Sequence, residues 1–413
     1  MEHAGTSLLR SGFSRQALDR WFFHNFFFLL FLCVTASQWV LLWWVWLHQW
    51  VDSVMLHAAG MAIFYGFNRY LVLGRAFGRG ARPRNFLPRL YYGFAFASLF
   101  CSVYLLLVGI AWAAAGTLVE VNAGTSVGQG FIWIANAGVA AIGSVFVYGY
   151  TIGQRRLIVR KFTIPVPDLP AALEGFRIAQ LSDIHVGPNM ARLELANFVS
   201  RANETKPDLI CITGDIADTI ESDLADGFPI LAQLKATHGV IAILGNHDHY
   251  CGATRVVEAL RRHTPFQVLR DEITSITVGA AVLQVIGLDD RGVNWARGVS
   301  ATPVLTDLLQ QLPGGGPVLL LCHRPDIFAQ AAELGIPLTL SGHTHGGQLG
   351  IPVGKGKVLN PSRIITPFDR GLFERNGCLL YVNCGLGVTG QRLRISTPRE
   401  ISVFELRRAE PVA

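Results

Sequence analysis

The hydrophobic positions of this chain follow two different patterns, and the change lies near residue 160. The first part contains four apolar stretches of about 20 residues or more, at 26–47, 54–73, 91–115 and 131–152. Because a helix rises 1.5 Å per residue, each stretch is long enough to cross a hydrocarbon core about 30 Å thick. The pattern predicts an N-terminal four-helix transmembrane domain over residues 1–159.

Basic residues are unevenly distributed among the connections of this first part. Three arginines precede the first stretch, five lie between residues 75 and 89, and four basic residues lie between 155 and 161. Residues 48–53 and 116–130 contain no Lys or Arg. The positive-inside rule then predicts a multi-pass protein of the cell inner membrane with everything after residue 161 in the cytoplasm. A cleaved export signal is the alternative, but the first stretch is too long for one and three more follow.

Residues 160–175 contain three prolines and separate the two patterns. Proline restricts the backbone, so a connection of this composition is stiff. We expect a short linker that holds the domain at residues 176–413 close to the membrane surface.

The second part has short apolar segments that each end in polar, chemically active residues. The segments are residues 178–181, 209–212, 240–243, 318–321 and 338–340. Helical patterns at 190–202, 253–262 and 302–312 alternate with them, and residues 266–289 have the pattern of a hairpin. This arrangement predicts an α/β domain of stacked mixed β-sheets flanked by helices, with the polar residues gathered at one edge of the sheets.

The polar residues form five motifs in a fixed order along the chain. They are Asp183-x-His185, Gly214-Asp215-x-x-Asp218, Gly245-Asn246-His247-Asp248, His323 and Gly342-His343-x-His345. Each motif alone is weak, and a single histidine is as often a hydrogen-bonded core residue. Together, over residues 176–406, they resemble the calcineurin-like metallophosphoesterases. The longer run Gly342-His343-Thr344-His345-Gly346-Gly347-Gln348 resembles the membrane-associated, YkuE-like branch of that family.

The resemblance implies a centre that holds two divalent metal ions. Such ions, about 3.5–4 Å apart, generate a nucleophile from water at neutral pH and neutralise the attacked phosphoryl group. The resemblance implies that Asp183, His185 and His345 hold one ion, that Asn246, His323 and His343 hold the other, and that Asp215 bridges them. A set of carboxylate, imidazole and amide ligands suits manganese best, with iron or zinc as alternatives.

The same resemblance leaves His247 without a metal and facing the scissile phosphate. It would donate a proton to the leaving group or stabilise the developing charge, with Asp218 orienting its ring. We expect Asp248 to have a supporting or structural role. The glycines of the motifs fit tight turns at the strand ends.

A long stretch without clear periodicity, residues 348–377, follows the last motif and combines basic with apolar residues. Long loops of this kind are often functional, and Lys355, Lys357 and Arg363 could contact an anionic lipid head group. A solvated connector is the equal alternative. Arg392 is a further candidate for substrate binding, and so is Arg394.

Charge separates the two parts of the chain and narrows the function. The 413 residues carry a net charge of +6, of which residues 1–161 contribute +9 and the remainder −3. An acidic second part without a basic run disfavours a nucleic-acid partner.

The sequence therefore predicts a membrane-bound phosphodiesterase or pyrophosphatase for an amphiphilic substrate such as UDP-2,3-diacylglucosamine, with the lipid bilayer as its partner. A general phosphomonoesterase and a membrane sensor or scaffold that only binds a ligand are the alternatives.

Overall fold

The computed structural model describes residues 15–47, 53–77, 86–218, 224–290, 302–354 and 357–409. The chain divides into two compact units, residues 1–145 and 146–413. The boundary falls inside a helix, so the last residues of that helix belong to the second unit.

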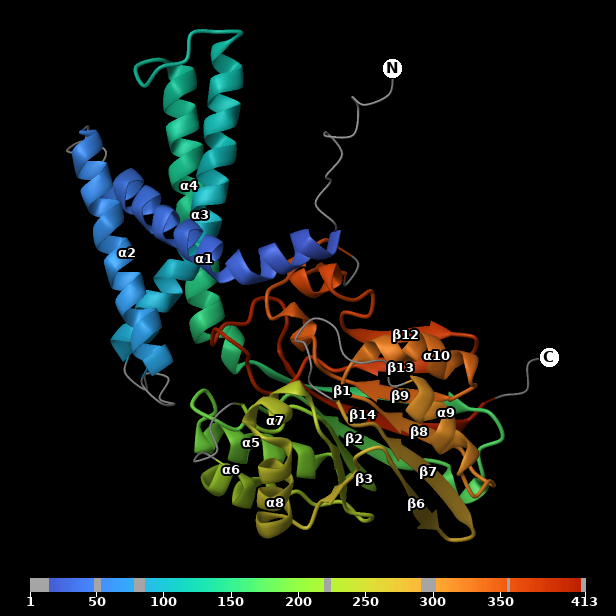
Figure 1. The fold of residues 1–413 in the computed structure, drawn as a ribbon. Coiled ribbons are helices and arrows are strands. Elements are labelled where there is room, and N and C mark those ends of the chain that lie inside the picture. The colour runs from blue at the N-terminus through green and yellow to red at the C-terminus, as the bar shows by residue number, and fades with distance from the viewer. Residues whose placement is uncertain are drawn as a thin grey trace, which may run out of the picture. The chain divides into compact units, whose positions relative to one another are not determined.

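The first unit consists of long helices at the four predicted stretches (Figure 1). They are α1 (Arg15–Leu42, continued by the π-helix Trp43–Leu47), α2 (Val54–Phe77), α3 (Phe86–Gly116) and most of α4 (Ser126–Thr151). Within the described ranges, two helical segments are long and apolar enough to cross a membrane, Gly93–Gly116 and Ser126–Arg155. Polar side chains join the first two helices: Asn68 of α2 donates to Thr35 Oγ1 and Gln38 Oε1 of α1 at 2.9 and 2.8 Å.

The structure differs from the sequence expectation at residues 160–175. The short 3₁₀ turn Gly153–Arg155 follows α4, and strand β1 (Leu157–Val166) then pairs in parallel with β14 (Arg399–Arg408) along its whole length. The first half of the expected linker is therefore an edge strand. Its partner lies more than 230 residues away, so local sequence does not reveal it, and Pro165 is tolerated because an edge strand leaves one row of backbone groups unpaired.

The second unit contains two six-stranded sheets. The first has the order β1-β14-β2-β3-β4-β5, with β2 (Arg177–Leu181), β3 (Leu209–Thr213), β4 (Val240–Ile243) and β5 (Gln267–Val268). The second has the order β12-β13-β9-β8-β7-β6, with β6 (Glu272–Val278), β7 (Ala281–Gly287), β8 (Val318–Leu321), β9 (Leu338–Ser341), β12 (Gly371–Arg375) and β13 (Cys378–Val382). Both sheets mix parallel and antiparallel pairs, which confirms the predicted α/β class with mixed sheets.

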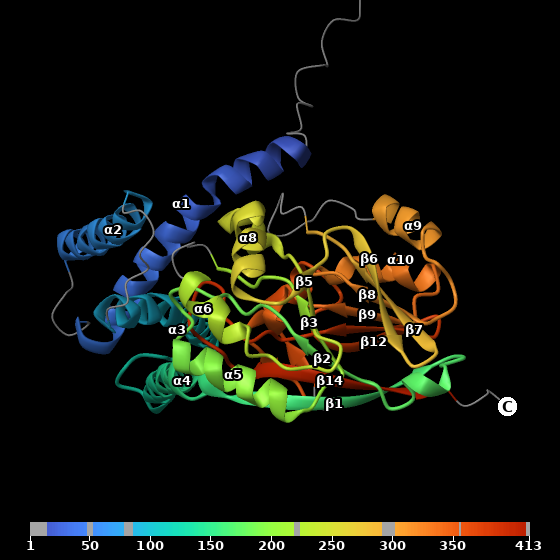
Figure 2. The ribbon, with the colours of Figure 1, turned by 90° about the horizontal axis from the view of Figure 1, so that it is seen from below.

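The sheets stack face to face, and helices cover their outer faces (Figure 2). Side chains such as Ile178, Ile241 and Val285 fill the space between the sheets. Helices α5 (Arg192–Glu204), α6 (Leu224–Leu231) and α8 (Ala253–His263) cover the first sheet, whereas α9 (Thr302–Gln310) and α10 (Phe328–Glu333) lie with the second. Full burial of each such side chain contributes about 1.5–3 kcal/mol, so the core fixes the strands whose ends carry the motifs.

Candidate metal centre

The five motifs meet where strands of both sheets end. Asp183 and His185 follow β2, Asp215 follows β3, and Asn246 and His247 begin the short helix α7 (Asn246–Cys251) after β4. The second sheet contributes His323 after β8, and His343 and His345 after β9. Six of the seven expected ligands are buried, with exposed fractions of 0% for Asp183 and His323 and 4% for His345, and His343 is half-buried.

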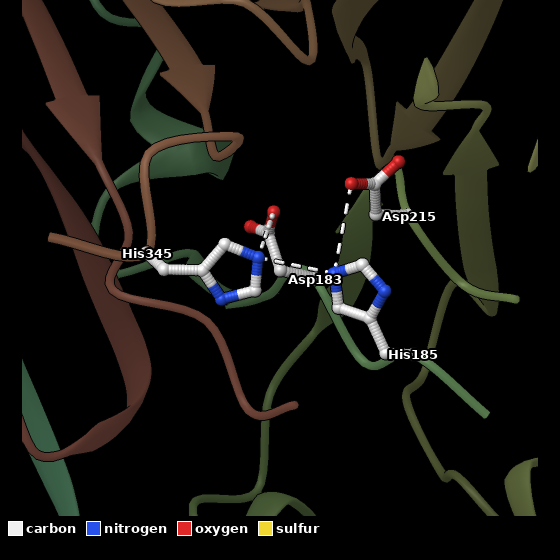
Figure 3. A group of neighbouring side chains, drawn as sticks. All are labelled: Asp183, His185, Asp215 and His345. Carbon is white, nitrogen blue, oxygen red and sulfur yellow. Dashed lines mark hydrogen bonds and ion pairs between the residues drawn. The ribbon is translucent and has the colours of Figure 1, made fainter. Parts of the chain in front are cut away.

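Four of these side chains form one compact cluster (Figure 3). Asp183, His185, Asp215 and His345 each present one ligand atom, and these atoms lie within 4.8 Å of one another. The Nε2 atoms of His185 and His345 are 3.0 Å apart, and His345 Nε2 is 3.4 Å from Asp183 Oδ1. Neutral and anionic groups converge here on one point, which is the arrangement that a cation requires.

Asp215 lies between this cluster and His323. Its Oδ2 atom lies 3.6 Å from His185 Nε2 and 3.3 Å from His323 Nε2. The ring of His323 is held by Nδ1, which lies 2.8 Å from the carbonyl oxygen of Thr213, and it contacts the ring of His343 edge to face. The buried Oδ1 of Asn246 has no hydrogen-bond partner within the described part of the chain. A cation would satisfy that oxygen.

The backbone at the ligands is held in the left-handed region. Five expected ligands have φ between 49° and 71°, namely Asp183, His185, Asp215, His343 and His345. Such conformations cost roughly 1–3 kcal/mol each and persist where the surrounding structure enforces them. Close packing is part of that enforcement: a Cβ on Gly342 would lie 1.9 Å from Ser182 Oγ, and one on Gly245 would lie 2.2 Å from Asp215 Oδ1.

Burial sets the charge of the ligands. It lowers the pKa of His185 to about 4 and holds the pKa values of His343 and His345 well below the usual range. These imidazoles are therefore neutral, the form that binds metals. Burial acts in the opposite direction on Asp215, but the charge and hydrogen bond of His323, together with His185 and His247, outweigh it, so the pKa of Asp215 lies well below its ordinary value.

His323 carries the positive charge that this cluster needs. Burial alone would lower its pKa, but the charge and hydrogen bond of Asp215, together with Asp183, raise the pKa to about 10. Two buried carboxylates thus retain a proton on their neighbour, and metal ions would supply the same compensation. The residues present fit the divalent ions that the motifs imply.

His247 lies at the edge of the cluster. Its Nδ1 is 3.5 Å from Asp218 Oδ1, its ring meets the ring of His185 edge to face, and its Nε2 is 3.4 Å from Thr389 Oγ1. Burial alone would lower the pKa of His247, but the hydrogen bond with Asp218 and the charges of Asp215 and Asp218 raise it above the ordinary value. The neighbouring Asp248 accepts from the backbone amides of Ile216, Ala217 and Gly245 and so supports the loops.

The basic residues expected to bind substrate occupy different environments. Lys355 lies outside the described residues. Lys357 is exposed, and the half-exposed Arg363 pairs with Asp369 at 3.3 Å.

Arg392 and Arg394 differ from the expectation. Arg392 binds Glu194 at 2.8 Å, and the fully buried Arg394 donates to the carbonyl oxygens of Gly385 and Gly387. Both guanidinium groups therefore bind other groups of the protein.

Sequence analysis missed Arg324, which directly follows His323. Its side chain is almost fully buried, its Nε donates to Asp290 Oδ2 at 2.7 Å, and its Nη1 lies 3.3 Å from His343 Nε2. A guanidinium fixed beside the expected ligands is suited to contact a phosphate, because its geometry matches phosphate oxygens. The only local signal for Arg324 in the sequence was its position next to His323, a histidine at a strand end.

Comparison with known proteins agrees with this geometry. The family description "Calcineurin-like phosphoesterase" matches residues 176–347. The chain is 30% identical over 285 residues to the uncharacterized metallophosphoesterase YkuE of Bacillus subtilis, which covers 68% of this chain and 96% of that protein. An uncharacterized metallophosphoesterase of Aquifex aeolicus is 33% identical over 256 residues, and the aligned region covers 61% of this chain and 92% of that protein.

The similarity extends to a protein named for its membrane attachment. A transmembrane protein with metallophosphoesterase domain from Danio rerio is 33% identical over 275 residues, covering 64% of this chain and 60% of its own length. The chain belongs to the calcineurin-like metallophosphoesterases, and YkuE is among its relatives. It is a hydrolase of phosphoester bonds that depends on divalent metal held by the buried Asp and His cluster.

Proposed function

We propose that this protein is a membrane-bound phosphodiesterase or pyrophosphatase that uses two metal ions, most suitably manganese, on an amphiphilic substrate at the cytoplasmic face. A lipid-linked pyrophosphate such as UDP-2,3-diacylglucosamine is an example of the proposed substrate class. The observation that carries the proposal is the direct continuation of the apolar helix α4 into β1, an edge strand of the domain that holds the centre. The active domain is thus attached without a flexible spacer.

In this proposal the ligands form two groups with Asp215 between them. Asp183, His185 and His345 hold one ion, and Asn246, His323 and His343 hold the other. The distances of Asp215 Oδ2 to His185 and to His323 support this division. When bound, the ions supply a nucleophile from water and positive charge for the phosphoryl oxygens.

His247 acts on the leaving group. Its Nδ1 is oriented by Asp218, which leaves Nε2 to give a proton to the departing oxygen. Arg324 binds a non-bridging phosphate oxygen while Asp290 fixes its guanidinium.

Four membrane spans with a cytoplasmic active domain complete the proposal. Helices lie at all four predicted stretches, and basic residues border only the connections assigned to the cytoplasm. A reporter fused to the C-terminus tests the orientation. Reporter activity in the periplasm would overturn it and remove the argument for a cytoplasmic substrate.

Hydrolysis by detergent-purified protein with added manganese tests the activity. Bis(p-nitrophenyl) phosphate and p-nitrophenyl phosphate serve as soluble esters, and the wild type is compared with Asp215→Ala and His247→Ala. We expect metal-dependent release from the diester that Asp215→Ala loses and His247→Ala only reduces, with metal content reduced only in Asp215→Ala. Chelation should abolish wild-type turnover, and added manganese should restore it.

The substrate class is tested next with UDP-linked diacylated sugars in mixed micelles. Faster turnover of the monoester than of any diester would favour a general phosphomonoesterase. Metal-loaded protein that hydrolyses no ester, soluble or lipid-linked, would favour a binding protein.

A further inference from the structure

The exposed apolar side chains of the second unit gather after the last motif. Ile351, Val353, Leu359 and Ile364 are 66%, 59%, 54% and 89% exposed. Single exposed apolar residues are ordinary, but four within fourteen residues of the chain are not. We call these four residues the apolar rim.

Three members of the rim share one face of a small hairpin. Strands β10 (Ile351–Pro352) and β11 (Val358–Leu359) pair antiparallel, with Ile351 directly opposite Leu359. Val353 is two residues beyond Ile351 and its amide donates to the Lys357 carbonyl, so its side chain lies on the same face. Ile364 belongs to the 3₁₀ turn Pro361–Ile364, which follows β11.

Hydrogen bonds fix the hairpin to residues 393–395, the segment that packs against the end of α4. The amide of Gly350 donates to the Ile395 carbonyl at 2.9 Å, and the amide of Ile395 donates to the Gln348 carbonyl at 2.8 Å. On its other side this segment packs on α4, because a Cβ on Gly149 would lie 2.4 Å from Leu393 Cδ1 and 2.7 Å from Ile395 Cγ1. One residue, Ile395, thus joins the hairpin to the last turns of a helix suited to cross a membrane.

The base of the hairpin is linked to the proposed proton donor, His247, through Thr389. Gln348 exchanges two hydrogen bonds with the backbone of Thr389, whose hydroxyl lies 3.4 Å from His247 Nε2. The rim is therefore coupled to the His247 side of the metal centre through two residues. The exposed Lys357 adds positive charge beside the apolar side chains, as in interfacial segments that meet anionic lipid, whereas Arg363 pairs with Asp369 at 3.3 Å.

We propose that the apolar rim inserts into the head-group region of the same bilayer that α4 crosses and forms a second lipid contact of the catalytic domain. This contact places the His247 side of the centre against the membrane surface, where an amphiphilic phosphoester presents its head group. The inference rests on the membrane attachment and the hydrolysis proposed above. It adds to them a lipid-binding surface.

Fluorescence quenching in lipid nanodiscs tests the proposal on the full chain. Val353→Cys and Ile364→Cys are made in a Cys33→Ser background, because the other six cysteines are buried. Each is labelled with a nitrobenzoxadiazole dye in discs of phosphatidylethanolamine and phosphatidylglycerol. Thr277→Cys is the matched control, since it is exposed near the β6–β7 turn, at the opposite end of β7 from Asp290.

The rim labels should lose roughly half or more of their emission when nitroxide lipid, labelled near the head group, is included, because interfacial segments lie about 5–10 Å deep. The Thr277 label should be unchanged. Rim labels that behave like the control would overturn the proposal, as would labels that are shielded from water but insensitive to nitroxide lipid, because a protein would then cover the rim.

A parallel measurement separates this inference from the proposed function. The same labelled proteins are assayed on soluble bis(p-nitrophenyl) phosphate. Hydrolysis without quenching would retain the enzyme and reject the lipid contact. Quenching without hydrolysis would retain the contact and reject the activity.

Discussion

Single residues at the centre combine enforced backbone geometry with controlled charge. Asp183, His185 and Asp215 have left-handed backbone that the tight strand-end turns impose. Burial keeps His185 and His345 neutral, while the neighbouring charges keep Asp215 ionised. The expected ligand set is thus organised without an ion, which reduces the reorganisation that metal binding would otherwise require.

Replacing His247 by Gln should affect esters according to their leaving group. General acid catalysis contributes about 10²–10⁴-fold when the leaving oxygen needs a proton, and much less for p-nitrophenolate. We expect a loss of that size for an alkyl phosphodiester and a loss of only roughly tenfold for bis(p-nitrophenyl) phosphate. Steady-state kinetics on both esters measures it, with metal content as the control. Equal losses on the two esters would reject the proton-donor role.

Replacing Arg324 by Lys should weaken substrate binding. The ammonium retains the charge but cannot bind both Asp290 and a phosphate in the planar geometry of a guanidinium. We expect KM for the diester to rise roughly tenfold, the equivalent of about 1.4 kcal/mol, with a smaller change in kcat. Arg375→Lys is the matched control, because Arg375 is an exposed residue that pairs with Glu333. If Arg324→Lys has the same kinetics as the control, Arg324 does not bind substrate.

The expected ligands could be named from the sequence because each motif is local and follows an apolar strand, and the structure brings these residues together at the strand ends. Arg324 could not be found in this way, since its proximity to His343 arises from the pairing of β8 with β9. Arg392 and Arg394 were assigned from charge alone. Their partners, Glu194 and the Gly385 and Gly387 carbonyls, are set by tertiary packing that charge does not reveal.

At the scale of elements, close contacts hold the junction between α4 and β1 in place. Gly153 lies against the carbonyl of Arg394, and a Cβ on it would be 2.1 Å from that oxygen. Gln154 accepts from Arg392 Nε at 3.0 Å, and its carbonyl accepts from the buried Arg399. The turn between helix and strand is therefore held by both backbone and side-chain contacts.

Gly153→Ala should disturb this junction, because a methyl group would displace a backbone carbonyl rather than a flexible side chain. Overpacking of this kind costs about 1–3 kcal/mol. We expect a lower thermal midpoint in detergent and reduced turnover of a soluble ester. Gly143→Ala is the control in the preceding helix α4, where a Cβ meets nothing within 4 Å, and it should be neutral or slightly stabilising. Equal midpoints for the two variants would contradict the close contact.

The element pattern of the second unit was largely predictable, because its buried strands are short apolar runs. The β10–β11 hairpin and the role of residues 157–166 were not. Strand β1 has a mixed pattern, with only Ile164 and Val166 of its apolar residues fully buried. These residues form a strand because they pair with β14, which lies near the other end of the sequence.

At the scale of the whole molecule, the limits of the family match and the limits of the folded domain differ. The match begins at residue 176, whereas hydrogen bonding of the first sheet begins at Leu157. A chain that starts at residue 176 should expose the edge of β14 and aggregate, because an unpaired strand edge is a template for pairing with another chain. A chain that starts at residue 153 retains β1 and should remain monodisperse in size-exclusion chromatography. Similar elution of both would show that β1 is dispensable.

The direct continuation of α4 into β1 also determines how the enzyme meets its substrate. Only residues 152–156 separate α4 from the ten paired residues of β1, so no long tether lies between this helix and the strand. Under the proposed function, a membrane-attached centre receives its lipid substrate by lateral diffusion. Its rate should follow the number of substrate molecules per unit area of membrane, so dilution with inert lipid slows turnover while dilution of the whole suspension does not.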